Sequence, residues 1–152
     1  MTTLEKTVPV SAIRNGTVID HIPAGKALKI VKLLGLSTDK LQVTVGVNLP
    51  SSRMGLKDLV KVEAFALNPK TASRVSILAP QATVSIIKNY EIEDKFHVSL
   101  PKSIEGVIAC PNRLCISNHE TVDPVILVKQ RWKGNIRLQC HYCRKNFSQQ
   151  DL

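Results

Sequence analysis

Short apolar runs rich in β-branched residues alternate with polar turns through the first part of the chain. Residues 8–13 and 17–22 are two such runs, and Asn15-Gly16 between them suits a tight turn because both residues tolerate positive φ. We therefore predict two strands joined by a hairpin or a sharp turn. The same alternation, interrupted by turn-forming residues, predicts four further strands: 42–49, 59–63, 83–88 and 91–98.

Two segments of this part have the period of an amphipathic helix instead. In residues 24–34 apolar side chains recur at i, i+3, i+4 and i+7, and Gly35 follows where a helix C-cap is expected. Asn68 and Pro69 suit an N-cap and a first helical residue, which predicts a second helix through Leu78. Strands interleaved with two helices favour a mostly antiparallel sheet with both helices on one face.

The pattern changes beyond residue 100. Helical periodicity disappears, short β-type runs remain at 125–131 and 135–139, and all four cysteines lie in this part. We predict an α+β chain of two domains. Residues 1–100 form the sheet-and-helix domain, and residues 101–152 form a small all-β four-cysteine zinc domain.

The cysteines carry the strongest local chemistry of the chain. Cys110-x4-Cys115 and Cys140-x2-Cys143 are two close pairs that stand well apart in the sequence. Two thiolates on each of two turns supply the tetrahedral set that zinc prefers, and four sulfurs leave no position for a catalytic water. The pattern predicts one structural Zn²⁺ ion held by all four thiolates.

Other interpretations of these cysteines stay open. Disulfides or plain buried thiols are disfavoured because the chain shows no export signal. His119 or His141 can replace one sulfur, although four cysteines already satisfy the ion. Cys140-His141-Tyr142-Cys143 also has the spacing of a redox pair, but it lacks the strand-to-helix setting of a thioredoxin motif.

Composition and charge narrow the class of partner. The chain is 43% apolar and 22% charged, as folded globular proteins are. No apolar run approaches the roughly 18 residues of a membrane span, and the first residues lack an export signal, so we expect a cytoplasmic protein with no membrane partner. With 21 Lys and Arg against 12 Asp and Glu, the net charge of +9 favours anionic partners: nucleotides, nucleic acid or an acidic protein face.

Several motifs, in one register along nearly the whole chain, carry a family resemblance. They are NGTVIDHIPA at 15–24, NLPS at 48–51, MGLKDLVKVE at 54–63, APQATV at 79–84, CPN at 110–112, CISN at 115–118 and CHYC at 140–143. In these motifs and in their order the chain resembles the regulatory chains of aspartate carbamoyltransferase. The resemblance implies a non-catalytic allosteric subunit in pyrimidine biosynthesis. Its first domain would bind CTP, ATP or UTP, and its zinc domain would hold the catalytic chain.

The resemblance also implies which residues contact each part of a bound nucleotide. The implied contacts are Ala12, Ile13 and Tyr90 for the base, Val10, Asp20 and Lys61 for the ribose, and His21, Lys57 and Lys95 for the phosphates. The residue types fit this use independently. Lysines and a histidine can neutralise a triphosphate, and a carboxylate can accept hydrogen bonds from ribose hydroxyls.

Three residues depart from the family pattern. Ser85 stands near the phosphates where an asparagine is common, so the polar side chain there is shorter. Leu114 and Arg144 stand where members can carry a polar and an acidic residue at the contact with the catalytic chain. We expect the docking surface to persist with different individual ion pairs. The resemblance further implies a homodimer through the first domain, within an assembly of catalytic trimers and regulatory dimers.

A nucleic-acid-binding zinc ribbon is the alternative function. It is supported by the net charge and by basic residues around the last predicted hairpin: Lys129, Arg131, Lys133 and Arg137. Its weakness is the small number of aromatic side chains that can stack on bases in that domain: Trp132, Tyr142 and Phe147. Nucleic acid is therefore the less favoured partner.

An enzyme acting on nucleotides is a third hypothesis. The sequence has no Walker A motif, no G-x-G-x-x-G and no Ser/His/Asp order with the context of a triad. The predicted metal site is closed to substrate as well. We expect a binding role, with no catalytic residue.

Overall fold

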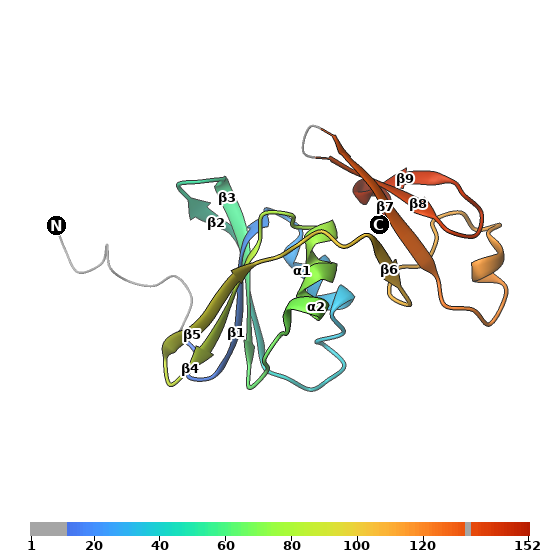
Figure 1. The fold of residues 1–152 in the computed structure, drawn as a ribbon. Coiled ribbons are helices and arrows are strands. Elements are labelled where there is room, and N and C mark those ends of the chain that lie inside the picture. Colours follow the sequence, from blue (N-terminus) through green and yellow to red (C-terminus); the bar gives the residue numbers. More distant parts are fainter. Residues whose placement is uncertain (1–11, 133–134) are drawn as a thin grey trace.

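The computed structural model describes residues 12–132 and 135–152. Its first part is an antiparallel sheet in which the described strands have the order β2-β3-β1-β4-β5. The strands are β1 (Gly16–Pro23), β2 (Val43–Ser51), β3 (Gly55–Glu63), β4 (Thr83–Lys88) and β5 (Glu91–His97). Two short helices, α1 (Ala27–Leu33) and α2 (Pro69–Ala72), lie together on one side of this sheet (Figure 1).

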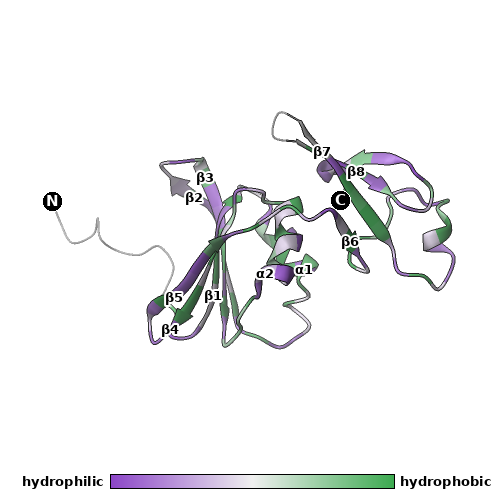
Figure 2. Cartoon of the chain, in the orientation of Figure 1, coloured by the Kyte–Doolittle hydropathy of each residue, from purple (hydrophilic) through white to green (hydrophobic). Residues whose placement is uncertain are grey.

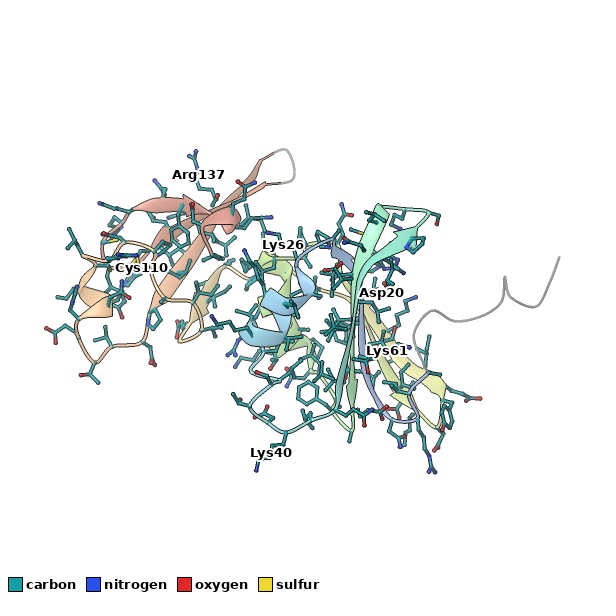
Figure 3. All side chains as sticks on the ribbon, turned by 180° about the vertical axis from the view of Figure 1, so that it is seen from behind. Asp20, Lys26, Lys40, Lys61, Cys110 and Arg137 are labelled. Atoms are coloured by element: carbon teal, nitrogen blue, oxygen red, sulfur yellow. The ribbon has the colours of Figure 1, made fainter. Side chains whose placement is uncertain are left out.

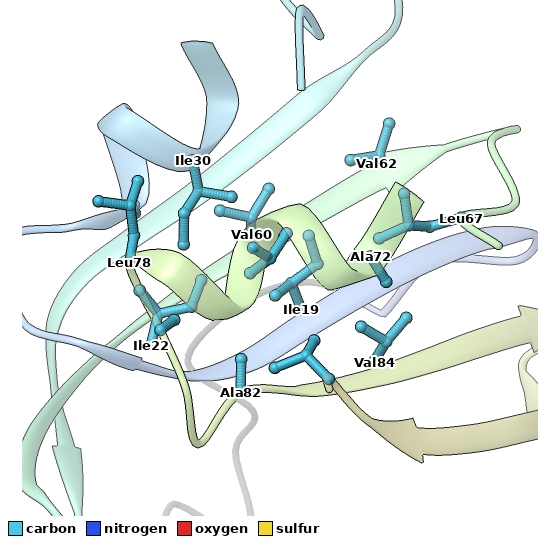
Figure 4. Close-up of a cluster of buried hydrophobic side chains, with 14 of the residues drawn as sticks. Ile19, Ile22, Ile30, Val60, Val62, Leu67, Ala72, Leu78, Ala82 and Val84 are labelled. Carbon is cyan, nitrogen blue, oxygen red and sulfur yellow. The ribbon is translucent and has the colours of Figure 1, made fainter. Parts of the chain in front are cut away.

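The core lies between the sheet and the two helices. One row of opposed residues crosses the sheet, Val45, Val60, Ile19, Val84 and Phe96, and its members all pack in this core. The helices add apolar side chains from the other side, among them Ile30 of α1 and Ala72 of α2 (Figure 4). Because side chains alternate between the faces of a strand, the residues next to this row point away from the helices. The opposite face of the sheet is thereby left for polar groups.

The helices are shorter than the sequence predicts. α1 begins at Ala27, three residues after the predicted start, because Pro23 to Lys26 form a turn closed by the Lys26 N–H on the Pro23 carbonyl at 3.1 Å. The predicted second helix is one α-helical turn capped by the Asn68 side chain on the Thr71 N–H, followed by a 3-10 turn, η2 (Ser73–Ile77). Ser73, Ser76 and the β-branched Val75 give this segment low helix propensity.

The turn at Asn15-Gly16 is only partly within the described residues. Residues 8–11 of the first predicted strand lie outside them, and Ala12 and Ile13 are not in a strand. Gly16 opens β1 with a φ of 150°, and a Cβ added there would lie 2.1 Å from the Val62 carbonyl oxygen. The position therefore requires glycine because β3 passes too close for a side chain.

The charged strand β5 forms one edge of the sheet. Its residues are nearly all exposed, and Figure 2 shows it largely hydrophilic beside the apolar β4. Charged side chains on an edge strand discourage pairing with the edges of other molecules. The edge is thus a solvated one, as its Glu, Asp and Lys content predicts.

The last part of the chain is a small antiparallel sheet with the order β6-β7-β8-β9 among the described strands. They are β6 (Ser103–Glu105), β7 (Val125–Trp132), β8 (Asn135–Cys140) and β9 (Asn146–Ser148), with the 3-10 turns η3 (Ile116–Asn118) and η4 (Gln149–Asp151). Three of the cysteines are buried in its core with Ile104, Ile126, Ile136 and Leu138. The observed chain is therefore α+β, with a four-cysteine β unit after the sheet-and-helix unit, as predicted.

The two units share apolar contacts. Ile77 of η2 packs in the core of the second unit, and Leu33 and Leu152 contact both cores. The Lys29 ammonium also donates to the Leu152 carbonyl at 2.9 Å. None of the helices in the described part of the chain has the length and apolar run that a membrane crossing needs.

Candidate anion site and metal centre

A polar row crosses the open face of the first sheet. Lys61 of β3 is opposite Val18 of β1, Val18 is opposite Ser85 of β4, and Ser85 is opposite Lys95 of β5. This row is one residue out of phase with the core row, so its side chains point away from α1 and α2. Figure 3 shows Asp20 and Lys61 on this side of the sheet.

Asp20 and Lys57 form an ion pair at the end of β1. The Lys57 ammonium lies 2.9 Å from Oδ1 and 3.1 Å from Oδ2 of Asp20, and both side chains are about a quarter exposed or less, at 20% and 27%. The His21 backbone N–H also donates to Oδ1, at 2.6 Å. Burial raises the pKa of the Asp20 carboxyl, but the hydrogen bonds from Lys57 and His21 and the nearby positive charges outweigh it and lower the pKa.

His21 lies in a β-bulge and has a backbone conformation unusual for its residue type. The register of β1 against β3 shifts between Ile19 and Ile22, and His21 has a φ of 58°. Its Nδ1 lies 3.0 Å from the Thr83 hydroxyl, which fixes the ring beside the polar row. The bulge thus turns an imidazole toward the same face as Asp20.

Positive charge surrounds the His21 ring. Burial lowers the pKa of His21; the Asp20 carboxylate raises it, and the charges of Arg53, Lys57 and Lys95 lower it further. The net pKa lies below the ordinary value, so the surroundings favour the neutral ring although a carboxylate is beside it. Positive charges on the β2–β3 turn (Arg53), on β3 (Lys57) and on β5 (Lys95) therefore all act on the His21 ring.

Lys61 is buried, which is uncommon for a lysine. Burial lowers the pKa of its ammonium, and the Asp20 and Glu63 carboxylates offset part of that shift. A charge held in this position gains from any anion that enters the row. Lys61 thus extends the cationic region from the end of β1 toward its middle.

A fully buried carboxylate beneath the site holds its backbone in place. Asp58 accepts hydrogen bonds from the Gly25 and Ala27 N–H groups on Oδ2, at 2.8 and 3.0 Å, and from the Asn48 N–H on Oδ1, at 3.0 Å. Asn48 occupies a second bulge, in β2, and also has a φ of 58°. One side chain therefore joins β3, the β2 bulge, the turn after β1 and the start of α1.

The predicted base contacts lie at the other end of β1. Tyr90 is 67% exposed on the β4–β5 turn, and its N–H donates to the Arg14 carbonyl at 2.9 Å. This bond places the segment with the exposed Ala12 and the buried Ile13 beside the turn. Val10 lies outside the described residues.

The predicted residues that the structure describes lie along the open side of the sheet, with the buried Ile13 at one end of this strip. Ala12, Ile13 and Tyr90 mark one end, and the row of Lys61, Ser85 and Lys95 crosses the middle. Asp20, His21 and Lys57 mark the far end. Asp20, a ribose contact by the resemblance, lies beside the phosphate contacts His21 and Lys57, and Lys95, a phosphate contact, lies in the middle row with Lys61, so ribose and phosphate contacts are interleaved along β1.

Three contributing residues are absent from the sequence prediction. Thr83 holds the His21 ring, Arg53 adds positive charge near it, and Asp58 holds the backbone. Asp58 has a detectable signal, because it alternates in phase with Val60 and Val62 of β3 and so falls on the core face. A carboxylate among core positions needs partners, which predicts a structural role.

The four cysteine sulfurs converge as predicted. The Sγ atoms of Cys110, Cys115, Cys140 and Cys143 all lie within 4.8 Å of one another. Cys110 and Cys143 are 3.7 Å apart, and Cys115 and Cys140 are 3.6 Å apart. A tetrahedral ion with metal–sulfur bonds of about 2.3 Å places its sulfurs about 3.8 Å apart, so the thiols fit a metal ion and are too distant for disulfides.

The surroundings of the thiols favour thiolate in part of the cluster. Burial raises the pKa of Cys115, but the Ser117 hydroxyl at 3.0 Å, the Ser117 N–H and the neighbouring thiols lower it to about 6. Burial and the other sulfurs raise the pKa of Cys110 to about 12. A dication would favour the thiolate at every position, because metal binding displaces thiol protons.

Backbone and amide groups fix the two cysteine turns. In the first, the Asn118 amide donates to the carbonyls of Cys110 and Asn112 at 3.1 and 2.8 Å. In the second, the Arg144 N–H donates to the Cys140 carbonyl at 3.0 Å, with Arg144 at a φ of 64°. The histidines take no part in the four-sulfur cluster, since His119 Nε2 lies 2.8 Å from the Arg113 carbonyl and His141 is exposed.

Two family models together match most of the chain. The model described as the aspartate carbamoyltransferase regulatory chain, allosteric domain, matches residues 8–99. The model of the metal binding domain of the same regulatory chain matches residues 102–152. The four converging thiols therefore lie within a region that matches a metal-binding domain.

Regulatory chains from several organisms are similar to this chain. An aspartate carbamoyltransferase regulatory chain of Tolumonas auensis is 47% identical over 96% of this chain and 94% of its own length. One of Aliivibrio salmonicida is 49% identical over 93% and 91%, and one of Pyrococcus horikoshii is 43% identical over 94% of each. With both domain models matched and these relatives aligned end to end, the chain belongs to the aspartate carbamoyltransferase regulatory chain family, the non-catalytic subunit of that enzyme.

Proposed function

We propose that this chain binds CTP, ATP and UTP on the open face of its first sheet and couples their binding to the catalytic chain, as a cytoplasmic subunit in pyrimidine biosynthesis. One observation carries the proposal. A carboxylate and a group of cations lie together on a sheet face that the core does not use. Neighbouring carboxylate and cationic groups suit a ligand that has both hydroxyls and phosphates.

Each part of the nucleotide has a chemically suited partner along the strip. Asp20 accepts hydrogen bonds from ribose hydroxyls, with Lys61 beside it. His21, Lys57 and Lys95 bind the phosphates, with the shorter Ser85 in the same row. The base lies at Tyr90 and the backbone of Ala12 and Ile13, where Val10 is the expected neighbour.

The second domain, residues 101–152, holds one structural zinc ion and docks on the catalytic chain. Four sulfurs at tetrahedral spacing favour zinc and close its coordination. The first cysteine turn presents apolar side chains to solvent, with Leu114 at 86% and Ile116 at 57% exposure. Exposed apolar groups on a rigid turn suit a protein partner, and the exposed Arg144 makes the nearby charge positive.

Allosteric action requires that nucleotides bind the two states of the assembly with different affinity, and a coupling of about 1–3 kcal/mol is ordinary. Regulatory dimers, joined through the first domain, would carry the bias to catalytic trimers. The apolar contacts of Ile77, Leu33 and Leu152 link the nucleotide-binding domain to the docking domain. Whether CTP or ATP inhibits depends on the quaternary equilibrium.

Calorimetric titration of the zinc-loaded chain with CTP tests this function. The chain should bind CTP saturably, and a Lys61→Ala, Lys95→Ala double variant should lose about 150-fold or more in affinity, because charge-assisted hydrogen bonds contribute about 1.5–3 kcal/mol each. A Lys40→Ala, Lys102→Ala variant removes two exposed lysines outside the strip and should bind as the parent does. Loss of binding in both double variants would indicate a general charge effect and contradict the proposed site.

Titration of the same chain with RNA at several salt concentrations tests the nucleic-acid alternative. Lys129 and Arg137 are exposed, while Lys133 and the side chains of Arg131 and Trp132 lie outside the described part of the chain. A ribbon that binds RNA would show an affinity that falls steeply with salt. Saturable CTP binding without such RNA binding supports the regulatory function.

Nucleotide affinity should rise as the pH falls. The free site holds the pKa of His21 low, through burial and the charges of Arg53, Lys57 and Lys95, opposed by Asp20. A bound phosphate supplies negative charge and raises that pKa, so the complex takes up a proton. The gain in affinity is complete below the pKa of the free site and is lost as the pH rises through the higher pKa of the complex. If the bound phosphate raises the pKa by about 1, the gain is about tenfold.

Titrations between pH 5 and pH 8 measure this dependence. His21→Asn is the matched control, since asparagine tolerates positive φ and can bond Thr83 but does not titrate. Ionisation of the phosphate itself changes the affinity of both proteins equally, so it cancels when the pH dependence of the variant is subtracted from that of the parent. Equal slopes in both proteins would contradict a role for His21.

A further inference from the structure

The Lys57 ammonium already has a partner within the chain. It contacts both oxygens of Asp20, at 2.9 and 3.1 Å, and the Asp20 carboxylate also accepts the His21 N–H. Both side chains are largely removed from water, so neither recovers full hydration when the pair opens. A phosphate that takes Lys57 must therefore compete with Asp20.

Separation of the pair leaves a half-buried carboxylate without its strongest partner. The His21 N–H remains, but a single backbone donor does not replace an ammonium. Ribose hydroxyls beside Asp20 can supply the missing donors. A ligand that has phosphate alone can take Lys57 but leaves Asp20 uncompensated, whereas a ribonucleotide satisfies both groups at once.

We propose that Asp20 is a specificity-determining residue: it pairs with Lys57, and this pair opens to a phosphate only when sugar hydroxyls replace Lys57 as donors to Asp20. The inference rests on the proposed nucleotide site and adds how that site selects nucleotides over other anions. Recognition of the sugar and of the phosphates is coupled through the exchange of partners. The site thereby discriminates against free polyphosphate, which its positive charge would otherwise attract.

Calorimetric titration with inorganic tripolyphosphate and with CTP tests the exchange in the full zinc-loaded chain. In Asp20→Asn, Lys57 is no longer held, and the affinity for tripolyphosphate should rise about fivefold, the size of an ion pair near a protein surface. The affinity for CTP should fall, because the amide is a weaker acceptor for the hydroxyls. The preference for CTP over tripolyphosphate should therefore decrease by more than about tenfold in total.

Two further variants test whether the change in preference is specific to the Asp20–Lys57 pair. Glu93→Gln changes the net charge by the same amount, and Glu93 of β5 lies 3.8 Å from Lys88 of β4, near the opposite end of β1 from Asp20. It should leave the preference unchanged. Lys57→Gln in the Asp20→Asn background should abolish the gain in tripolyphosphate affinity, since the released group is then absent.

The outcomes separate this inference from the function on which it rests. If the parent chain binds CTP but Asp20→Asn weakens both ligands alike, Asp20 is structural and the exchange is wrong. If Glu93→Gln raises tripolyphosphate affinity as much as Asp20→Asn, net charge is the cause and the exchange is again wrong. If the parent chain binds no CTP, the nucleotide function itself fails.

Discussion

Replacement of Cys140 by serine should unfold the second domain while the first stays folded. Cys140 is fully buried, contacts Cys115 at 3.6 Å and contributes one of the four sulfurs. A domain of this size has too small an apolar core to fold securely without help. Zinc binding contributes about 10–16 kcal/mol to the folding of small metal domains, so loss of a ligand removes more than the domain's own stability.

Amide hydrogen exchange with metal analysis measures this result. Protection should disappear from β7 and β8 but persist in β1, β3 and β4, whose core contains no cysteine. A chelator should have the same effect on the parent chain. CTP binding should survive in both cases, whereas association with the catalytic chain should be lost.

His141→Asn is the control for this experiment. His141 lies inside the second cysteine turn but is exposed and outside the sulfur cluster. Its replacement should change neither metal content nor protection. Retention of a full zinc equivalent by Cys140→Ser, with protected β7 and β8, would show that a histidine or water replaces the sulfur and that the four-cysteine site is dispensable.

The regular elements of this fold follow from alternation and turn chemistry. In β3, the apolar Val60 and Val62 alternate with Lys61 and Glu63, and the strand buries the first pair in the core as the period predicts. The end of the second α-helix at Ala72 could not be predicted, because helix propensity alone does not say where an α-helical turn gives way to a 3-10 turn. The cysteine site was predictable because its ligands come as two local pairs.

The candidate anion site was harder to predict from the sequence. The two bulges at His21 and Asn48 shift the register of the strands, and a strict two-residue period does not show such a shift. Arg53 lies on the turn between β2 and β3, so its proximity to His21 depends on how that hairpin folds back. The role of Asp58 was inferable in kind, as a carboxylate in a core position, but its three backbone partners come from two segments distant in the sequence, Gly25 and Ala27 in one and Asn48 in the other.

Replacement of Asp58 by alanine should destabilise the first domain by about 3–5 kcal/mol, because it removes the acceptor from three backbone N–H groups, two of them beside the buried start of α1. Asp58→Asn keeps the size but not both acceptor oxygens, so its cost should be smaller. Denaturant titration followed by circular dichroism measures both changes. Asp39→Ala, at an exposed loop position, should cost less than about 0.5 kcal/mol.

Replacement of Asp58 by alanine or asparagine should also weaken CTP binding, although Asp58 is buried beneath the site and faces away from it. Without the carboxylate, the Asn48 bulge and the turn at Gly25 lose their hydrogen bonds to β3, so the positions of Lys57 and His21 relative to each other are held less firmly. Affinity should therefore fall even under conditions where Asp58→Asn is still folded. If Asp58→Asn lowers stability but binds CTP as the parent does, the buried carboxylate supports the fold alone, and the bulges keep their shape by strand pairing.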